Sequence, residues 1–180
     1  MNSDNIFKYV KNINKKSKEA FEVNSRSSSK DRNLALLNIS KIIKKEQEEI
    51  LKANKIDIQN AKNKQLNNAF VDRLLLDDKR IDNIVESLKQ ISEMSDPIGV
   101  ELSNWTQPNG LNISRISVPL GIIGIIYESR PNVTIDAGSL CIKSGNTAIL
   151  RGGSDSINSS KILAQCMQKG LESANLPGNT

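Results

Sequence analysis

The first half of the chain carries apolar residues at helical spacing in several segments. One segment precedes the serine-rich stretch 25–29, a second follows it, and shorter ones lie around 74–76 and along 81–91. The charged run 44–49 is most simply the solvated face of the second segment. The pattern predicts four amphipathic helices in residues 1–96. Their apolar faces would be formed by Ile6, Val10, Ile13, Ala20 and Phe21, by Leu34, Leu37, Ile42, Ile43, Ile50 and Leu51, and by Ile81, Ile84, Val85, Leu88 and Ile91.

Helical spacing ends at residues 96–99, which read Asp-Pro-Ile-Gly, because the residue before a proline avoids the α conformation and glycine permits turns. Residues 101–107 and 111–118 then flank Pro-Asn-Gly at 108–110, whose Asn-Gly step supplies the positive φ angles of a tight hairpin turn. The apolar alternation changes phase along the second of these segments, so we expect a β-bulge near Arg115. This region is therefore predicted to be a β-hairpin.

From residue 119 onwards, short apolar runs alternate with helical patterns. Residues 121–126 and 147–150 are continuous apolar runs, typical of strands buried on both faces of a parallel sheet. Residues 133–143 and 157–174 have helical spacing, so the order is β-α-β-α and lacks the third strand of a mononucleotide-binding half-sheet. The predicted fold class is α/β, with a helical region (1–96), a β-hairpin (97–118) and an incomplete Rossmann-like parallel unit (119–180).

Composition limits the chemistry that this chain can perform. Histidine is absent, which excludes Ser-His-Asp triads, histidine-ligated zinc and a histidine general base. Cys141 and Cys166 are not spaced like a zinc knuckle or a redox pair, and both fall at core positions of predicted helices, so we expect structural thiols and no metal site. The longest nearly apolar run, 118–127, is about half of what a membrane helix needs. With no apparent leader, we expect a soluble, cytoplasmic protein and no membrane partner.

The net charge of +5 raises the question of nucleic-acid binding. Most of the charged residues lie in the first 96 positions, where both signs are mixed, and the six aromatic residues do not alternate with basic ones. A platform for base stacking would need such an alternation. We therefore expect no nucleic-acid partner.

Two loops stand where ligands bind in open α/β sheets, beyond the carboxyl ends of strands and at the starts of helices. They are residues 128–132 and 151–154. Arg151 offers a cation or a donor to a ribose hydroxyl, the glycines that follow it permit close backbone approach, and Ser154 or Asp155 can cap the next helix. The chain has no Gly-x-Gly-x-x-Gly fingerprint, and ordinary strand-to-helix junctions also use glycine turns with caps. A nucleotide site and a plain junction both remain open on spacing alone.

Two stretches, VPLGIIGIIYESRPNVT (118–134) and SLCIKSGNTAILRGGS (139–154), closely resemble the gamma-glutamyl phosphate reductase family, or glutamate-5-semialdehyde dehydrogenases, of the aldehyde dehydrogenase superfamily. The resemblance covers essentially the whole chain. It implies NADPH-dependent reduction of L-glutamyl 5-phosphate to L-glutamate 5-semialdehyde with release of phosphate, the second step of proline biosynthesis. In that chemistry a cysteine thiolate attacks the acyl phosphate, and hydride then reduces the thioester.

The resemblance assigns cofactor contacts to the second loop. Arg151 matches the lysine that superfamily relatives place at the adenosine ribose. Gly152, Gly153 and Ser154 match the turn beside it. The implied cofactor is NADP(H), and the implied NADP-binding unit is the region 119–180.

The resemblance assigns substrate contacts to the first loop, through Ser129 and Arg130. Residues 129–132 match the loop in which relatives place an asparagine amide in the oxyanion hole, and Asn132 is the candidate for that role although the loop is shorter here. Arg130 could equally meet the phosphate of the substrate. The roles of Asn132 and Arg130 therefore remain two alternatives.

The family's nucleophilic cysteine lies in a catalytic domain beyond the matching region, and neither cysteine of this chain replaces it. We therefore expect an amino-terminal portion of the enzyme, without the catalytic domain and inactive alone, with glutamyl phosphate and NADPH as partners. The full-length protein is expected to be a homo-oligomer that uses the hairpin 97–118. The alternative is a free-standing, non-catalytic module that binds a nucleotide or a partner.

Overall fold

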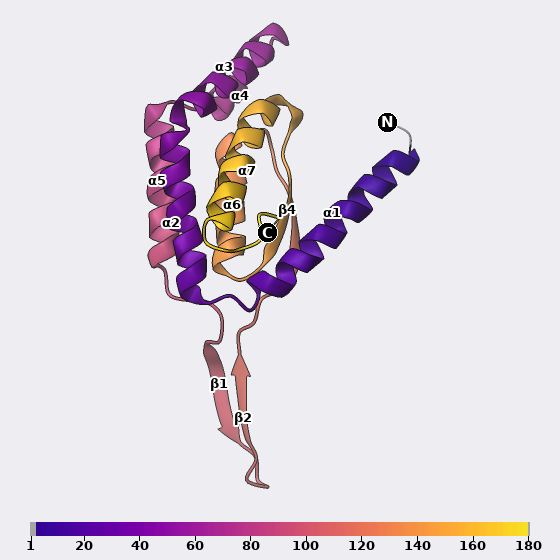
Figure 1. Ribbon diagram of the computed structural model, residues 1–180, viewed down its shortest axis with the longest axis vertical. Coiled ribbons are helices and arrows are strands. Elements are labelled where there is room, and N and C mark those ends of the chain that lie inside the picture. Colours follow the sequence, from indigo (N-terminus) through magenta and orange to yellow (C-terminus); the bar gives the residue numbers. More distant parts are fainter. Residues whose placement is uncertain (1–2, 180) are drawn as a thin grey trace.

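The computed structural model describes residues 3–179. Helices make up the amino-terminal half (Figure 1): α1 (Ser3–Asn24), α2 (Ser29–Lys45), α3 (Gln47–Asn63), α4 (Asn68–Leu74) and α5 (Asp78–Glu93). The serine-rich stretch separates α1 from α2 as predicted, because Ser28 and Asp31 form a capping box at the start of α2. The helix predicted around 74–76 corresponds to α4, but α4 ends at Leu74, so the helix lies earlier in the chain than predicted. No helix within residues 3–179 has the length and apolar character needed to cross a membrane.

The single helix predicted over 34–51 is two helices in the structure. α2 and α3 meet at Glu46, whose φ of −90° and ψ of 12° lie at the end of one helix and the start of the next. The run 44–49 is therefore a junction between helices and not the face of one. No proline or glycine stands in this run, so the sequence carries no breaker there.

The buried face of α2 also differs from the predicted one. Ile43 is fully buried as predicted, but Leu36 and Ile39 are also fully buried, whereas Leu34 and Leu37 are exposed. α2 packs against both α5 and α7, and the side that meets these two helices becomes the buried side. Tertiary contacts, and not the helical period alone, select the face.

β1 (Glu101–Thr106) and β2 (Asn112–Ile116) form an antiparallel hairpin that projects from the rest of the molecule (Figure 1). The register shifts at Leu102, so the bulge lies in β1, opposite the position near Arg115 where it was expected in the other strand. Of the Asn-Gly pair only Gly110 has a positive φ, of 86°. The Gln107 N–H donates to the Leu111 carbonyl, so residues 108–110 form the loop of the hairpin as predicted, with one positive φ where the Asn-Gly step was expected to supply more.

The parallel unit has the predicted order: β3 (Ile122–Ile126), α6 (Pro131–Lys143), β4 (Thr147–Arg151), a short 3₁₀ turn η1 (Ser154–Ser156) and α7 (Ile157–Glu172). β3 and β4 pair in parallel over their whole length. Figure 1 shows β4 between α1 on one side and α6 with α7 on the other. The expected burial on both faces is wrong for β3, since Ile126 is 81% exposed. Within residues 3–179, β3 pairs with β4 alone and is an edge strand.

The helical region and the parallel unit share one hydrophobic core, because α2 packs against α5, α6 and α7. α7 lies close to α2 at Gly170, where a Cβ would lie 2.8 Å from the backbone nitrogen of Ile39. Glycine is therefore required for this approach. Fully buried residues of the core include Leu36, Ile39, Ile43, Leu88, Ile135, Ile142, Leu163 and Leu171.

Polar contacts join the regions where the helical half meets the hairpin. Arg32 pairs with Asp96 at 2.7 Å, and its side chain is almost fully buried. The Lys143 ammonium donates to the Ser92 carbonyl at 3.0 Å and to Asn33 Oδ1 at 2.7 Å. Burial lowers the pKa of Lys143. These bonds tie the end of α6 to α2 and α5, so the parallel unit has a fixed position on the helical region.

Candidate functional site

The parallel pairing brings the two predicted ligand loops to one edge of the sheet. Ile126 and Arg151, the last residues of β3 and β4, are register partners. The N–H of Tyr127 donates to the Arg151 carbonyl at 3.1 Å and extends the pairing into the first loop. Residues 127–130 and 152–154 therefore leave the sheet side by side, as the strand-end rule for α/β sheets predicts.

The two glycines of the second loop are explained by contact with the first loop. A Cβ at Gly153 would lie 1.9 Å from Ser129 Oγ and 2.9 Å from the Ser129 nitrogen, and a Cβ at Gly152 would lie 3.0 Å from the Tyr127 ring. Ser129 is buried in this contact. The glycines thus allow the loops to pack on each other, and Ser129 positions the turn.

The expected cap of the following helix is wrong. Neither Ser154 nor Asp155 caps α7, and Asp155 instead pairs with Lys64 at 2.6 Å. Asp57 of α3 takes this place: its carboxylate accepts from the backbone N–H groups of Asn158 (3.2 Å) and Ser159 (2.8 Å). A buried carboxylate from another helix therefore occupies amides that could otherwise meet a phosphate.

Arg151 ends β4 with an exposed side chain. No side chain within residues 3–179 forms a hydrogen bond or ion pair with its guanidinium. Its five N–H donors are available to a ligand at the sheet edge. The charge of Arg151 is thus not paired within the described part of the chain, and it is available to a ligand at this edge of the sheet.

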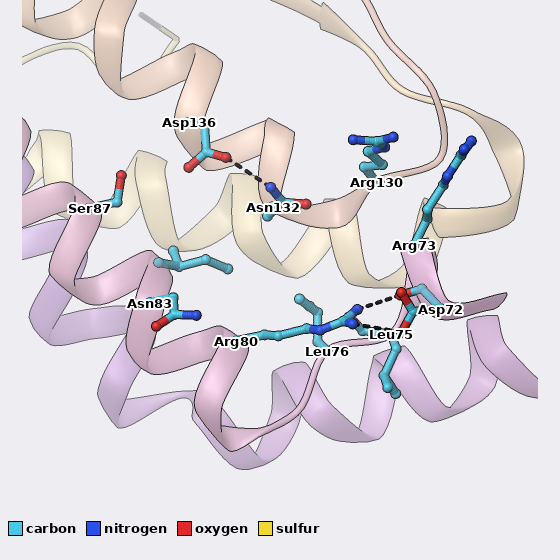
Figure 2. A pocket seen from close by; sticks show the side chains of 11 residues that line it. Asp72, Arg73, Leu75, Leu76, Arg80, Asn83, Ser87, Arg130, Asn132 and Asp136 are labelled. Carbon is cyan, nitrogen blue, oxygen red and sulfur yellow. Dashed lines mark hydrogen bonds and ion pairs between the residues drawn. The ribbon is translucent and has the colours of Figure 1, made fainter. Parts of the chain in front are cut away.

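A cleft of about 450 Å³ lies beside the first loop, between α4, α5 and the start of α6 (Figure 2). It contains two of the predicted site residues, Arg130 and Asn132, and not Ser129 or the glycine turn. The cleft is lined by Asp72, Arg73, Leu75, Leu76, Arg80, Asn83, Ile84, Ser87, Arg130, Asn132 and Asp136.

Three arginines line one side of the cleft, and acidic partners hold each of them. Glu128 pairs with Arg73 at 3.2 Å and with Nε of Arg130 at 3.5 Å. Arg80 pairs with Asp72 at 2.7 Å and donates to the backbone carbonyls of residues 72 and 75. The terminal nitrogens of Arg130 have no partner among residues 3–179, so this arginine can bind an anion in the cleft.

Asn132 and Asp136 lie one helical turn apart on α6 and face the cleft. The amide of Asn132 donates to Asp136 Oδ2 at 2.9 Å. Burial raises the pKa of Asp136, and the hydrogen bond from Asn132 opposes that shift. This bond uses one of the two amide hydrogens of Asn132 and leaves the second one for a ligand.

Both cysteines are buried in the helical core, as expected for structural thiols. Burial raises the pKa of Cys141, and burial together with Glu46 raises that of Cys166 to about 11. The thiolate is the nucleophilic form, so neither side chain is activated. No group of three or more acidic or cysteine side chains within residues 3–179 could hold a metal ion.

Several functional groups of the site escaped the sequence reasoning. Arg73 and Arg80 stand in helical segments whose charges look like ordinary solvated residues, and Asp136 stands in an apolar helix. Tyr127, which hydrogen-bonds Thr134 at 2.8 Å, belongs to the motif that carries the family resemblance and could have been singled out there.

No protein-family model matches the chain. The gamma-glutamyl phosphate reductase of Clostridium tetani is 45% identical over 177 residues, which cover 98% of this chain and 41% of the relative. That of Bartonella tribocorum is 52% identical over 151 residues, which cover 84% of this chain and 37% of the relative. The chain is homologous to the gamma-glutamyl phosphate reductases. It spans about two fifths of the length of these relatives.

Solved structures of gamma-glutamyl phosphate reductases agree with this relationship. The Thermotoga maritima protein superimposes with a TM-score of 0.90 at 39% identity, over 93% of this chain and 41% of that one. The Saccharomyces cerevisiae protein gives 0.88 at 29% identity, over 93% and 44%. A propionaldehyde dehydrogenase from Clostridium phytofermentans matches at 0.58 and 16% identity, over 92% of this chain and 34% of that one, which shows the shared aldehyde dehydrogenase-like fold. The α/β fold class predicted from the sequence is confirmed.

Proposed function

We propose that this chain supplies the cofactor-binding part of an enzyme that reduces L-glutamyl 5-phosphate to L-glutamate 5-semialdehyde with NADPH and releases phosphate. The observation that carries the proposal is the homology to gamma-glutamyl phosphate reductases over nearly the whole chain. The two loops at the sheet edge, with an arginine at each, support it.

The cofactor contacts in this proposal belong to residues 151–154. Arg151 binds the adenosine ribose of NADPH, and its fork of donors suits the 2′-phosphate that distinguishes NADPH from NADH. Gly152 and Gly153 allow the turn beside it to pack against the first loop, and Ser154 follows at the start of η1. NADPH supplies the hydride; the residues of this chain bind and orient it. Because Asp57 occupies the α7 amides, the proposal assigns the phosphate contact to Arg151 and not to the start of that helix.

The substrate contacts in this proposal belong to the first loop and the cleft. The free end of Arg130 binds the phosphate group of the substrate and stabilises it as it leaves. The second amide hydrogen of Asn132 donates to the carbonyl oxygen of the substrate, where negative charge develops. Ser129 holds the loop against the glycine turn and so sets the distance between cofactor and substrate. The nucleophile is a cysteine of a catalytic domain outside these 180 residues, because both thiols here are buried and protonated.

Steady-state kinetics of the product of the complete gene test the cofactor assignment. Arg151→Ala should raise the KM for NADP⁺ by about tenfold or more, as expected for the loss of a charge-assisted hydrogen bond. Arg26→Ala, which removes an exposed arginine between α1 and α2, is the matched control and should leave this KM unchanged. Equal KM values in the two variants would refute the role of Arg151.

The hairpin supports a proposal about assembly. Leu102, Trp105 and Ile116 on the two strands, and Leu111 just before β2, are exposed large apolar residues of the hairpin, which projects from the body (Figure 1). We propose that they meet a second copy of the protein and make it a homo-oligomer. Light scattering should show an oligomer that Trp105→Lys dissociates. A monomeric wild-type protein at micromolar concentration would contradict this.

A non-catalytic binding module is the second candidate, favoured by the burial of both thiols. The nucleotide sequence that follows codon 180 separates the two candidates. An in-frame continuation with a cysteine-containing domain supports the reductase, whereas a stop codon supports the module.

A further inference from the structure

The cleft beside α6 has opposite electrostatic character at its two ends. Figure 2 shows Arg130 and Arg73 at one end, Asp136 and Ser87 at the other, and Asn132 between them. A ligand that lies along this line meets the positively charged guanidinium groups of Arg130 and Arg73 at one end and the carboxylate of Asp136 at the other. The cleft therefore fits an elongated molecule with an anionic group at one end and a cationic group at the other.

Asp136 has a hydrogen-bond acceptor to spare at the far end. Its Oδ2 accepts from Asn132, and no lysine or arginine within residues 3–179 pairs with the carboxylate. A partly buried carboxylate without a cation is destabilised by lost solvation, which an ammonium group from a ligand would restore. Asp136 is thus a site for a positive charge that the protein itself does not supply.

Ser87 of α5 lies near Asp136, and Asn83 lies one turn before Ser87 on the same side of that helix and lines the same cleft (Figure 2). Their side chains make no hydrogen bond to any of residues 3–179. An amide and a hydroxyl can both donate to a carboxylate. Recognition of an α-amino acid needs an acceptor for its ammonium group and donors for its carboxylate, and α6 and α5 offer these two kinds of group.

We propose that this end of the cleft binds the α-amino-acid head of the substrate, with Asp136 accepting from the α-ammonium and Asn83 and Ser87 donating to the α-carboxylate. The inference rests on the proposed function, because Arg130 then holds the phosphate at the opposite end of the same molecule. It makes Asp136 the residue that selects an amino acid over a plain dicarboxylic acyl phosphate. A substrate without the ammonium would leave two carboxylates facing each other without a cation.

Calorimetric titration of the chain with stable phosphonates tests this inference. L-2-amino-6-phosphonohexanoate has the chain length of glutamyl phosphate, with carbon in place of the bridging oxygen and without the acyl oxygen, and 6-phosphonohexanoate differs from it only by lacking the amino group. The amino compound should bind about tenfold or more tightly than its analogue, as expected for a hydrogen bond to a charged group. In Asp136→Asn, which keeps an acceptor for Asn132, the two compounds should bind equally.

Two further variants show whether the preference for the amino compound depends on Asp136 in particular. Arg130→Gln should weaken both compounds by the same factor and preserve the preference for the amino compound. Asp82→Asn, an exposed carboxylate of α5 outside the cleft, is the control and should change neither. Equal binding of the two compounds to the wild type, or no binding of either, would overturn the inference. The proposed function would survive that result if Arg151→Ala still raised the KM for NADP⁺, because Arg151 lies outside the cleft.

Discussion

Replacing Asp57 by alanine should strongly destabilise the fold, because this carboxylate caps α7 from a neighbouring helix. It accepts from the backbone N–H of Asn158 at 3.2 Å and from its side-chain amide at 2.7 Å. It also accepts from the backbone N–H and hydroxyl of Ser159, at 2.8 and 2.6 Å. Asp57 and Ser159 are both buried, so water cannot replace the lost bonds at Ser159.

The size of the effect follows from these contacts. Loss of a helix cap costs about 0.5–2 kcal/mol, and each buried donor left without a partner costs about 1–3 kcal/mol. Asn158 lies nearer the surface and can turn to solvent, so the penalty comes mainly from the two donors of Ser159. We expect a loss of about 3–4 kcal/mol in the free energy of unfolding, which lowers the Tm of a chain of this size by about 10 °C.

Urea unfolding of the chain, followed by circular dichroism, measures this loss. Asp155→Ala is the matched control, because Asp155 is the cap that the local sequence predicts but forms a surface pair with Lys64 in the structure. That variant should lose less than about 1 kcal/mol. A loss below about 1 kcal/mol for Asp57→Ala, or a larger loss for Asp155→Ala, would refute the assignment of the cap.

The loop contact and the buried thiol give two more predictions. Gly153→Ala should cost about 1–3 kcal/mol because its Cβ would overlap Ser129 Oγ, whereas Gly124→Ala, which has open space in β3, should cost almost nothing in the same urea assay. Equal losses in the two variants would contradict the packing of the loops. Alkylation of Cys166 by iodoacetamide should be slow in the native chain and rise about tenfold per pH unit between pH 8 and 10, because the pKa of about 11 keeps the thiolate scarce. A rate that levels off near pH 9 would show an ordinary thiol.

The helical period predicted some faces correctly and failed on others for a physical reason. Ile81, Ile84, Leu88 and Ile91 of α5 are buried as the spacing indicates. In α2 the run 34–37 is apolar at nearly every position, so two adjacent faces are equally plausible from the period. The contacts with α5 and α7, which come from distant parts of the chain, choose between them.

The candidate site was predictable where it depends on strand order and not where it depends on packing between distant helices. The alternation of apolar runs and helical patterns placed the loops 128–132 and 151–154 at one sheet edge, and the structure brings the strand ends before them together. Asp57 is about one hundred positions away in sequence from the helix that it caps, so no local pattern could reveal this cap. The cleft likewise arises only when α4, α5 and α6 come together.

The central claim, that this chain is the cofactor-binding part of a glutamyl phosphate reductase, is tested most directly by phosphate-dependent formation of NADPH from NADP⁺ and glutamate 5-semialdehyde. The product of the complete gene and the 180-residue chain are assayed in parallel. The account predicts turnover that requires phosphate with the complete product and none with the 180-residue chain. Turnover by the 180-residue chain, or a complete product without phosphate-dependent turnover, would contradict it.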